Sequence, residues 1–183
     1  MWIFLLTLAM VFLTTIIGYV VVRNQLVSDG SWKPAGAESL PWELVPSTFL
    51  LVLSSLTTHL ARSAAVRGGR APTTGAWMAL TALLAAGFLV FQVLAWVELV
   101  RQELAFDESL YAWLFFVLTG LHALHVLCGI PPLVIVTIRS FRGAYGRTPV
   151  SHAGLTFFAM YWHFLDVVWI CLYALLLWGS RTS

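Results

Sequence analysis

Residues 76–100 read AWMALTALLAAGFLVFQVLAWVELV, with Glu98 as their one charged side chain. A membrane-spanning helix needs about 20 mostly apolar residues, because each residue adds about 1.5 Å and the hydrocarbon layer is about 30 Å thick. This stretch is long enough and apolar enough to form such a helix. It therefore predicts an integral membrane protein.

Four further segments of the same kind lie on both sides of this stretch. We predict a single membrane domain over residues 1–183, an all-α bundle whose five transmembrane helices cover residues 1–22, 42–61, 76–100, 110–138 and 153–178. The first segment is interpreted as a retained span, because it lacks the basic start and the cleavage site of a signal peptide. Pro131 and Pro132 predict that the fourth helix is kinked or ends its regular part early.

The composition of the whole chain supports this class. Hydrophobic residues make up 60% of the 183 residues and charged residues 10%, against roughly 45–50% and ~25% in soluble proteins. A soluble or disordered protein is excluded on this balance, and the net charge of +2 does not indicate nucleic acid as a partner. Cys128 and Cys171 both lie in apolar runs, so we expect them to be buried and unpaired.

The loop charges predict the orientation of the bundle. The loops after the second and fourth predicted spans are basic and contain no acidic residue, whereas the other two contain both signs. The basic residues are Arg62, Arg67 and Arg70 in one loop and Arg139, Arg142 and Arg147 in the other. Because Lys and Arg prefer the cytoplasmic side of a membrane, we expect a cytoplasmic N-terminus and a C-terminus outside.

Ionisable side chains at membrane depth are the candidate functional residues, because hydrocarbon makes them costly. His122 and His125 are three residues apart in the fourth span, and His163 and Asp166 are three apart in the fifth, so each pair shares a helix face. His122 and His163 both lie roughly 15 Å into their spans. We therefore expect the two clusters to meet near the middle of the membrane.

Two interpretations of these side chains remain open. The first is a haem or metal site, because bundles hold such cofactors with imidazoles on facing helices. The second is a hydrogen-bond network that joins the helices, and it is favoured on two grounds. The spacing of His122 and His125 is poorly suited to two axial ligands of one haem, and Asp166 is the one deep carboxylate where a di-metal site needs several.

Residues 115–126, FFVLTGLHALHV, and residues 161–169, YWHFLDVVW, resemble two signature sequences of subunit III of haem-copper terminal oxidases. They occur in the order and at the separation found in that family. The resemblance is firm over residues 76–180 and weaker over the rest of the chain. The typical subunit has seven spans, and this five-span pattern resembles the shorter forms that begin at the family's third span.

The resemblance implies a non-catalytic subunit of a respiratory oxidase that reduces oxygen to water with proton translocation, in a bacterial plasma membrane. In the family, subunit III docks on subunit I, accompanies subunit II and the other subunits, and holds phospholipids. It also supports the stability of the complex, proton uptake and sustained turnover. Haem and copper belong to the partner subunits, so the resemblance implies no catalytic, cofactor or metal residue in this chain. Whether the electron donor is cytochrome c or a quinol is left open.

The resemblance also assigns roles to single residues. It implies packing and hydrogen bonding for His122, His125, His163 and Asp166. It implies contact with lipid for His152, Glu98 and Trp162.

The chain departs from the family at positions that usually carry carboxylates. Leu8 stands where the family often has a carbodiimide-reactive glutamate, and Ala95 and Thr156 replace two further acids. We therefore expect a lipid site that is partly kept and chemically altered.

Three alternatives remain. One is the related accessory subunit of a nitric oxide reductase. A stand-alone membrane enzyme holding haem or metal on His122, His125 and His163 is the second. A transporter is the third, and the lack of a broken-helix pair in corresponding halves argues against it.

Overall fold

The computed structural model describes residues 2–32, 40–68, 70–102, 109–145 and 149–181. These residues form five helices, namely α1 (Trp2–Ser28), α2 (Leu44–Val66), α3 (Ala71–Arg101), α4 (Leu110–Phe141) and α5 (Pro149–Ser180). All five are long and apolar enough to cross a membrane, and no strand occurs among the residues described. The predicted all-α architecture with five helices of spanning length is confirmed.

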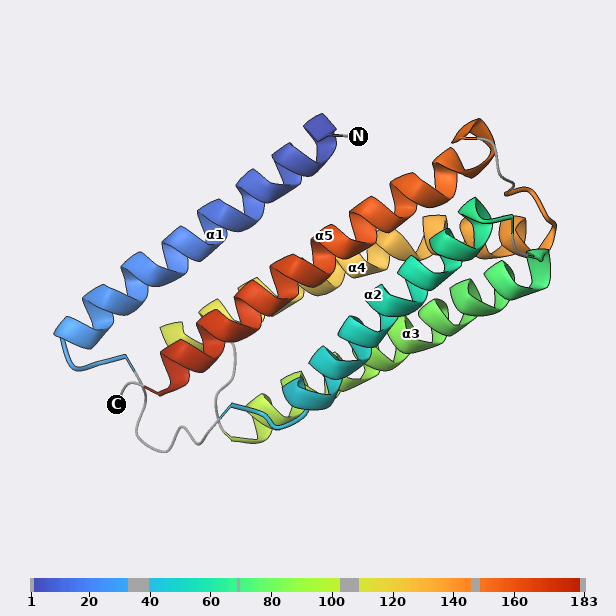
Figure 1. Ribbon diagram of the computed structural model, residues 1–183. Helices are drawn as coiled ribbons and strands as arrows, with labels where there is room; N and C mark the ends of the chain where they lie inside the picture. Colours follow the sequence, from blue (N-terminus) through green and yellow to red (C-terminus); the bar gives the residue numbers. More distant parts are fainter. Residues whose placement is uncertain (1, 33–39, 69, 103–108, 146–148, 182–183) are drawn as a thin grey trace.

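Helices α2 to α5 form a four-helix core, and α1 is attached to one side of it (Figure 1). Each core helix packs on the next one along the chain, and α2 also packs on α5, which closes the ring. Within the described parts of the chain, α1 contacts α4 and α5 alone. The N- and C-terminal ends of the chain lie at opposite ends of the bundle (Figure 1).

Small residues allow two of these helix pairs to approach closely. A Cβ atom on Gly129 of α4 would lie 3.0 Å from the ring of Tyr161 and 3.2 Å from the indole of Trp162, both on α5. A Cβ atom on Gly75 of α3 would lie 2.5 Å from the ring of Phe141. Association of helices in lipid depends on such close packing, because the apolar side chains gain little by leaving one apolar medium for another.

Aromatic side chains fasten the C-terminal end of α1 to the end of α5. The indole N–H of Trp32 donates to the carbonyl oxygen of Gly179 at 2.9 Å, and the ring of Tyr19 meets Trp32 edge-on with centroids 5.6 Å apart. The guanidinium carbon of Arg23 lies 3.5 Å from the ring centroid of Trp178, a cation–π arrangement. Because Arg23 is buried in this way, α1 continues past it to Ser28, where the sequence had indicated an end at residue 22.

The two prolines of α4 do not interrupt it. The helix runs from Leu110 through Pro131 and Pro132 to Phe141, so its regular part does not end early. Membrane helices tolerate proline because neighbouring groups satisfy the carbonyls that lose their partners.

Every helix exposes apolar side chains on the outer surface of the bundle, such as Ile3 on α1 and Leu83 on α3, which are exposed by 83% and 69%. Cys128 and Cys171 are free, and both are exposed. Their predicted burial is therefore wrong. An apolar run in a membrane helix has a lipid-facing side, and cysteine is accepted there as a small hydrophobe.

The two basic loops lie at the same end of the bundle. A Cβ atom on Gly143, just after α4, would lie 3.6 Å from the Cβ of Ala71, where α3 begins. Arg67 and Arg142 are exposed at this end. Outside the described residues lie the loop charges Lys33, Glu38, Glu103, Asp107, Glu108 and Arg147, and the side of the membrane on which each loop lies stays a prediction.

Candidate functional site

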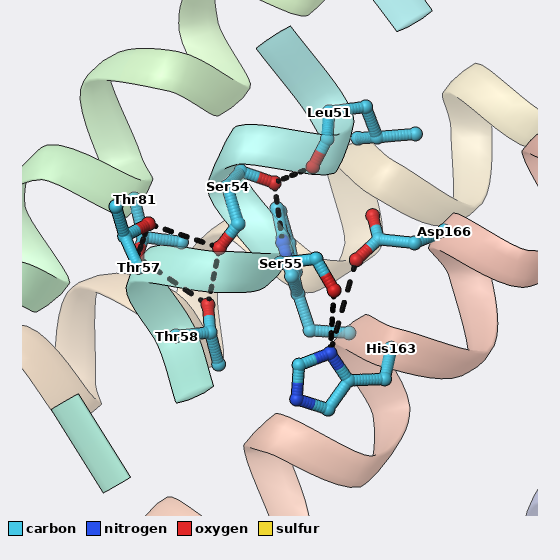
Figure 2. A network of polar contacts seen from close by, with 9 residues as sticks. Leu51, Ser54, Ser55, Thr57, Thr58, Thr81, His163 and Asp166 are labelled. Atoms are coloured by element: carbon cyan, nitrogen blue, oxygen red, sulfur yellow. Dashed lines mark hydrogen bonds and ion pairs between the residues drawn. The ribbon is translucent and has the colours of Figure 1, made fainter. Parts of the chain in front are cut away.

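The ionisable pair of α5 packs against α2. Nδ1 of His163 lies 2.6 Å from the hydroxyl oxygen of Ser55 and 4.0 Å from Oδ2 of Asp166 (Figure 2). Asp166 is buried, and neither of its carboxylate oxygens has a hydrogen-bond partner among the described residues. One nitrogen of His163, Nδ1, therefore faces both a hydroxyl group of α2 and a carboxylate of its own helix.

Further hydrogen bonds continue along the seam between α2 and α5. Trp169 donates through its indole N–H to the hydroxyl of Thr48 at 3.0 Å, and Trp162 donates in the same way to Ser54 at 2.9 Å. Closer to the end of α2, Nε of Arg62 donates to the hydroxyl of Thr156 at 3.4 Å. Each of these contacts satisfies a polar group that lipid cannot satisfy.

On its other side, α2 is joined to α3 by hydroxyl groups. Thr57 shares a hydrogen bond of 2.8 Å with Thr81, and Thr58 lies 3.3 Å from the same oxygen (Figure 2). All three side chains are buried. No residue of α2 was among the predicted site residues, although the run of Ser and Thr over residues 54–58 is the signal that would have identified its polar contacts.

His122 has apolar surroundings and lies apart from this network. Its ring is fully buried, with the ring centroids of Trp169, Phe88 and Phe12 at 4.8, 5.7 and 6.2 Å. Neither ring nitrogen has a hydrogen-bond partner among the described residues. We expected His122 to meet His163 and Asp166 of α5 in one network. In the structure, the α5 residue that faces the ring of His122 is Trp169.

His125 lies on the side of α4 that faces α1. Its Nδ1 is 2.7 Å from the carbonyl oxygen of Leu121 in its own helix, and its ring packs on Phe12 with centroids 5.0 Å apart. The hydroxyl of Tyr161 donates to the carbonyl oxygen of His125 at 2.7 Å. The contact between α4 and α5 at this level is thus made by a tyrosine and a backbone carbonyl.

The three candidate lipid contacts occupy different environments. Trp162 is 1% exposed in the core, which argues against contact with lipid because its ring and its N–H are both enclosed. Glu98 is half-buried near the end of α3, with Oε2 3.9 Å from Arg101. His152 is half-buried in the first turn of α5.

An apolar cavity lies between the N-terminal part of α1 and the two helices that α1 contacts. Its volume is about 330 Å³, and it is open on one side. The cavity is lined by Phe4, Cys128, Pro132, Val136, Gly154, Phe157, Phe158 and Tyr161. A lining of this kind suits an apolar chain better than a polar ligand.

Two long stretches of this chain thus form the facing centres of α4 and α5, and these stretches carry the family resemblance. The model of one protein family, described as cytochrome c oxidase subunit III, matches residues 1–181. The chain belongs to this family.

Similar proteins within the cytochrome c oxidase subunit III family come from bacteria and from eukaryotes. Cytochrome c oxidase subunit 3 of Corynebacterium diphtheriae is 38% identical over 157 residues, which cover 85% of this chain and 74% of that protein. Cytochrome bo(3) ubiquinol oxidase subunit 3 of Pseudomonas putida is 30% identical over 173 residues, with 94% and 80% covered. Cytochrome c oxidase subunit 3 of Synechocystis sp. is 34% identical over 175 residues, with 94% and 71% covered.

These family members carry the names of two kinds of oxidase, one for cytochrome c and one for ubiquinol. Membership of the subunit III family supports an accessory subunit of a haem-copper oxidase. It does not favour the nitric oxide reductase subunit or the stand-alone haem or metal enzyme.

Proposed function

We propose that this chain is the non-catalytic subunit III of a respiratory haem-copper oxidase that reduces oxygen to water with proton translocation. The observation that carries the proposal is the family match over residues 1–181. The bundle fits this role because most of its buried polar groups join its own helices, while apolar side chains cover most of its outside.

In this role the chain docks on subunit I and accompanies subunit II and the other subunits of the complex. The five helices of spanning length support a multi-pass position in a membrane. We propose that this membrane is a bacterial plasma membrane, although the relatives include eukaryotic as well as bacterial proteins. The electron donor belongs to other subunits, and the two kinds of oxidase among the relatives leave it open.

Haem and copper reside in the partner subunits under this proposal, and His122 serves packing. The environment of His122 supports that assignment, because both ring nitrogens face a cage of aromatic side chains. Among the residues described, no group of three or more His, Cys, Asp and Glu side chains is placed to hold a metal ion.

Phospholipid is the second partner in this proposal. The apolar cavity beside α1 has the volume and lining for part of an acyl chain. Glu98 and His152 lie near helix ends, where headgroups are found. Trp162 is left out of the lipid site because it is buried in the core.

Affinity purification of the tagged chain from its native membranes tests the proposal. We expect a subunit I that contains haem and copper to co-purify together with a subunit II, with the haem spectrum of an oxidase. The chain expressed alone is expected to show no stoichiometric Soret band and no copper. Purification of the chain from membranes without any haem protein would contradict the proposal.

A further inference from the structure

Basic side chains occupy the outer face of the seam between α2 and α5. His59 of α2 is exposed, and the side chain of His163 on α5 is 36% exposed. Their ring centroids lie 6.4 Å apart. Arg62 follows His59 by three residues on the same helix and is half-buried. We call these three side chains, His59, Arg62 and His163, the outer seam strip.

The strip presents hydrogen-bonding atoms outward. The ring of His163 turns Nδ1 toward Ser55 and Asp166 and turns Nε2 away from them (Figure 2). Arg62 uses Nε on Thr156 at 3.4 Å, whereas a guanidinium has five N–H donors in all. The strip therefore retains capacity to bind an acceptor that comes from outside this chain.

The depth of the strip decides what kind of acceptor can reach it. α2 ends at Val66, so Arg62 lies about 6 Å, His59 about 10 Å and Ser55 about 16 Å from that end at 1.5 Å per residue. A lipid headgroup near the end of α2 can reach Arg62. It does not reach His163, which lies at the level of Ser55, near the middle of about 30 Å of hydrocarbon.

Ionisable side chains within membrane spans face protein or water, because lipid cannot pair with them. A second polypeptide is therefore the occupant that the geometry favours over lipid. The strip contains one permanent cation and two imidazoles and no acid of its own, since Asp166 is enclosed behind His163. Its charge is complementary to a carboxylate.

We propose that a transmembrane helix of a partner subunit covers the outer seam strip and brings a carboxylate to it. This inference rests on the proposed function, because the partner is another subunit of the same oxidase. It identifies the seam between α2 and α5 as a face by which this chain joins the complex.

Photocrosslinking in the assembled oxidase tests the inference. His59→p-benzoylphenylalanine places a probe in the strip, and Val52→p-benzoylphenylalanine places one seven residues earlier on the same face of α2, in case the first variant does not assemble. Leu83→p-benzoylphenylalanine on α3, exposed by 69%, is the control on another face. We expect an adduct with a partner's membrane helix from the α2 probes, within about one helical turn of an Asp or Glu, and adducts with lipid from position 83.

Adducts with lipid alone from both α2 probes, in complexes that keep this chain, would overturn the inference and leave the proposed function standing. A protein adduct remote from any acidic residue would overturn the assignment of a carboxylate. If no haem protein co-purified with any of the variants or with the unmodified chain, the proposed function itself would fail.

Arg62→Gln gives a second measurement. We expect this variant to lower severalfold the amount of chain retained on the oxidase after detergent washing at raised ionic strength. Arg67→Gln, which changes an exposed arginine beyond the end of α2, is the matched control and should be retained as the unmodified chain is. Equal retention of the two variants would contradict a partner carboxylate at Arg62.

Discussion

His122 is a polar side chain inside an aromatic cage. Its ring is fully buried against Phe12, Phe88 and Trp169, and both ring nitrogens lack a hydrogen-bond partner among the described residues. A buried polar group without a partner costs about 1–3 kcal/mol. Packing of the ring stabilises the bundle, whereas the two unpaired ring nitrogens destabilise it.

Replacing this ring by phenylalanine tests the interpretation. We expect His122→Phe to leave the thermal stability of the chain in detergent unchanged or to raise it, because the shape is nearly kept and the unpaired nitrogens are removed. His163→Phe is the matched change on α5, and it should lower stability because Ser55 loses its partner. A marked loss of stability in His122→Phe would show that a ring nitrogen of His122 makes a stabilising polar contact, which would contradict a role in packing alone.

Asp166 is expected to hold α5 in place and to carry no chemistry. Asp166→Asn keeps the size and much of the hydrogen-bonding capacity of the side chain, so it should hardly lower the amount of this chain that assembles with the oxidase. Asp166→Leu should lower the retained amount more, since it removes the carboxylate 4.0 Å from Nδ1 of His163 and leaves that imidazole beside an apolar side chain within the membrane span. Retention of the chain on the purified complex is the measurement. If Asp166→Asn abolished initial turnover while the chain stayed bound, Asp166 would be acting on protons.

Close packing of helix on helix depends on glycine at one position of α4 and not at another. A Cβ on Gly129 would meet Tyr161 at 3.0 Å and Trp162 at 3.2 Å, whereas a Cβ on Gly120 has 3.9 Å to its nearest neighbour, Trp96. Gly129→Ala should therefore destabilise the bundle by about 1–3 kcal/mol through overpacking. Gly120→Ala should be neutral or stabilise it by about 0.5–1 kcal/mol, the usual effect within a helix.

Unfolding of both variants in mixed micelles against a denaturing detergent gives these differences. Equal effects of the two substitutions would show that α4 and α5 do not approach as closely at Gly129 as the structure has them.

The number and type of helices could be predicted because each span is an apolar run of sufficient length. The residues at which the helices end were less predictable. Arg23 reads as a stop in the sequence, yet α1 continues because the guanidinium packs on Trp178, a contact between residues far apart in the chain.

The partners of the polar side chains depend on which helices are neighbours. Consecutive helices were expected to meet, and α4 does pack on α5. The closing contact between α2 and α5 is a property of the folded bundle, and it gives His163 its partner Ser55. Trp169 donates to Thr48 of α2, and its ring packs on His122. The polar residues predicted to meet at one depth therefore lie in two separate environments.

The orientation of the whole molecule in the membrane is predicted from its loops. Cysteine labelling in intact cells, on a variant in which Cys128 and Cys171 are replaced, should protect positions 67 and 142 from an impermeant reagent and label position 107. The reason is the excess of arginine in the two loops at one end of the bundle. Labelling of position 142 from outside would reverse the predicted topology.

The central claim is that this chain supports the oxidase without taking part in its chemistry. The most direct test compares the oxidase purified with this chain and without it, by haem content, by initial rate of oxygen reduction and by the persistence of that rate over many turnovers. The claim predicts equal haem content and a near-normal initial rate in both preparations, with activity lost sooner in the preparation that lacks the chain. A stoichiometric loss of haem, or an abolished initial rate with the haems intact, would contradict it.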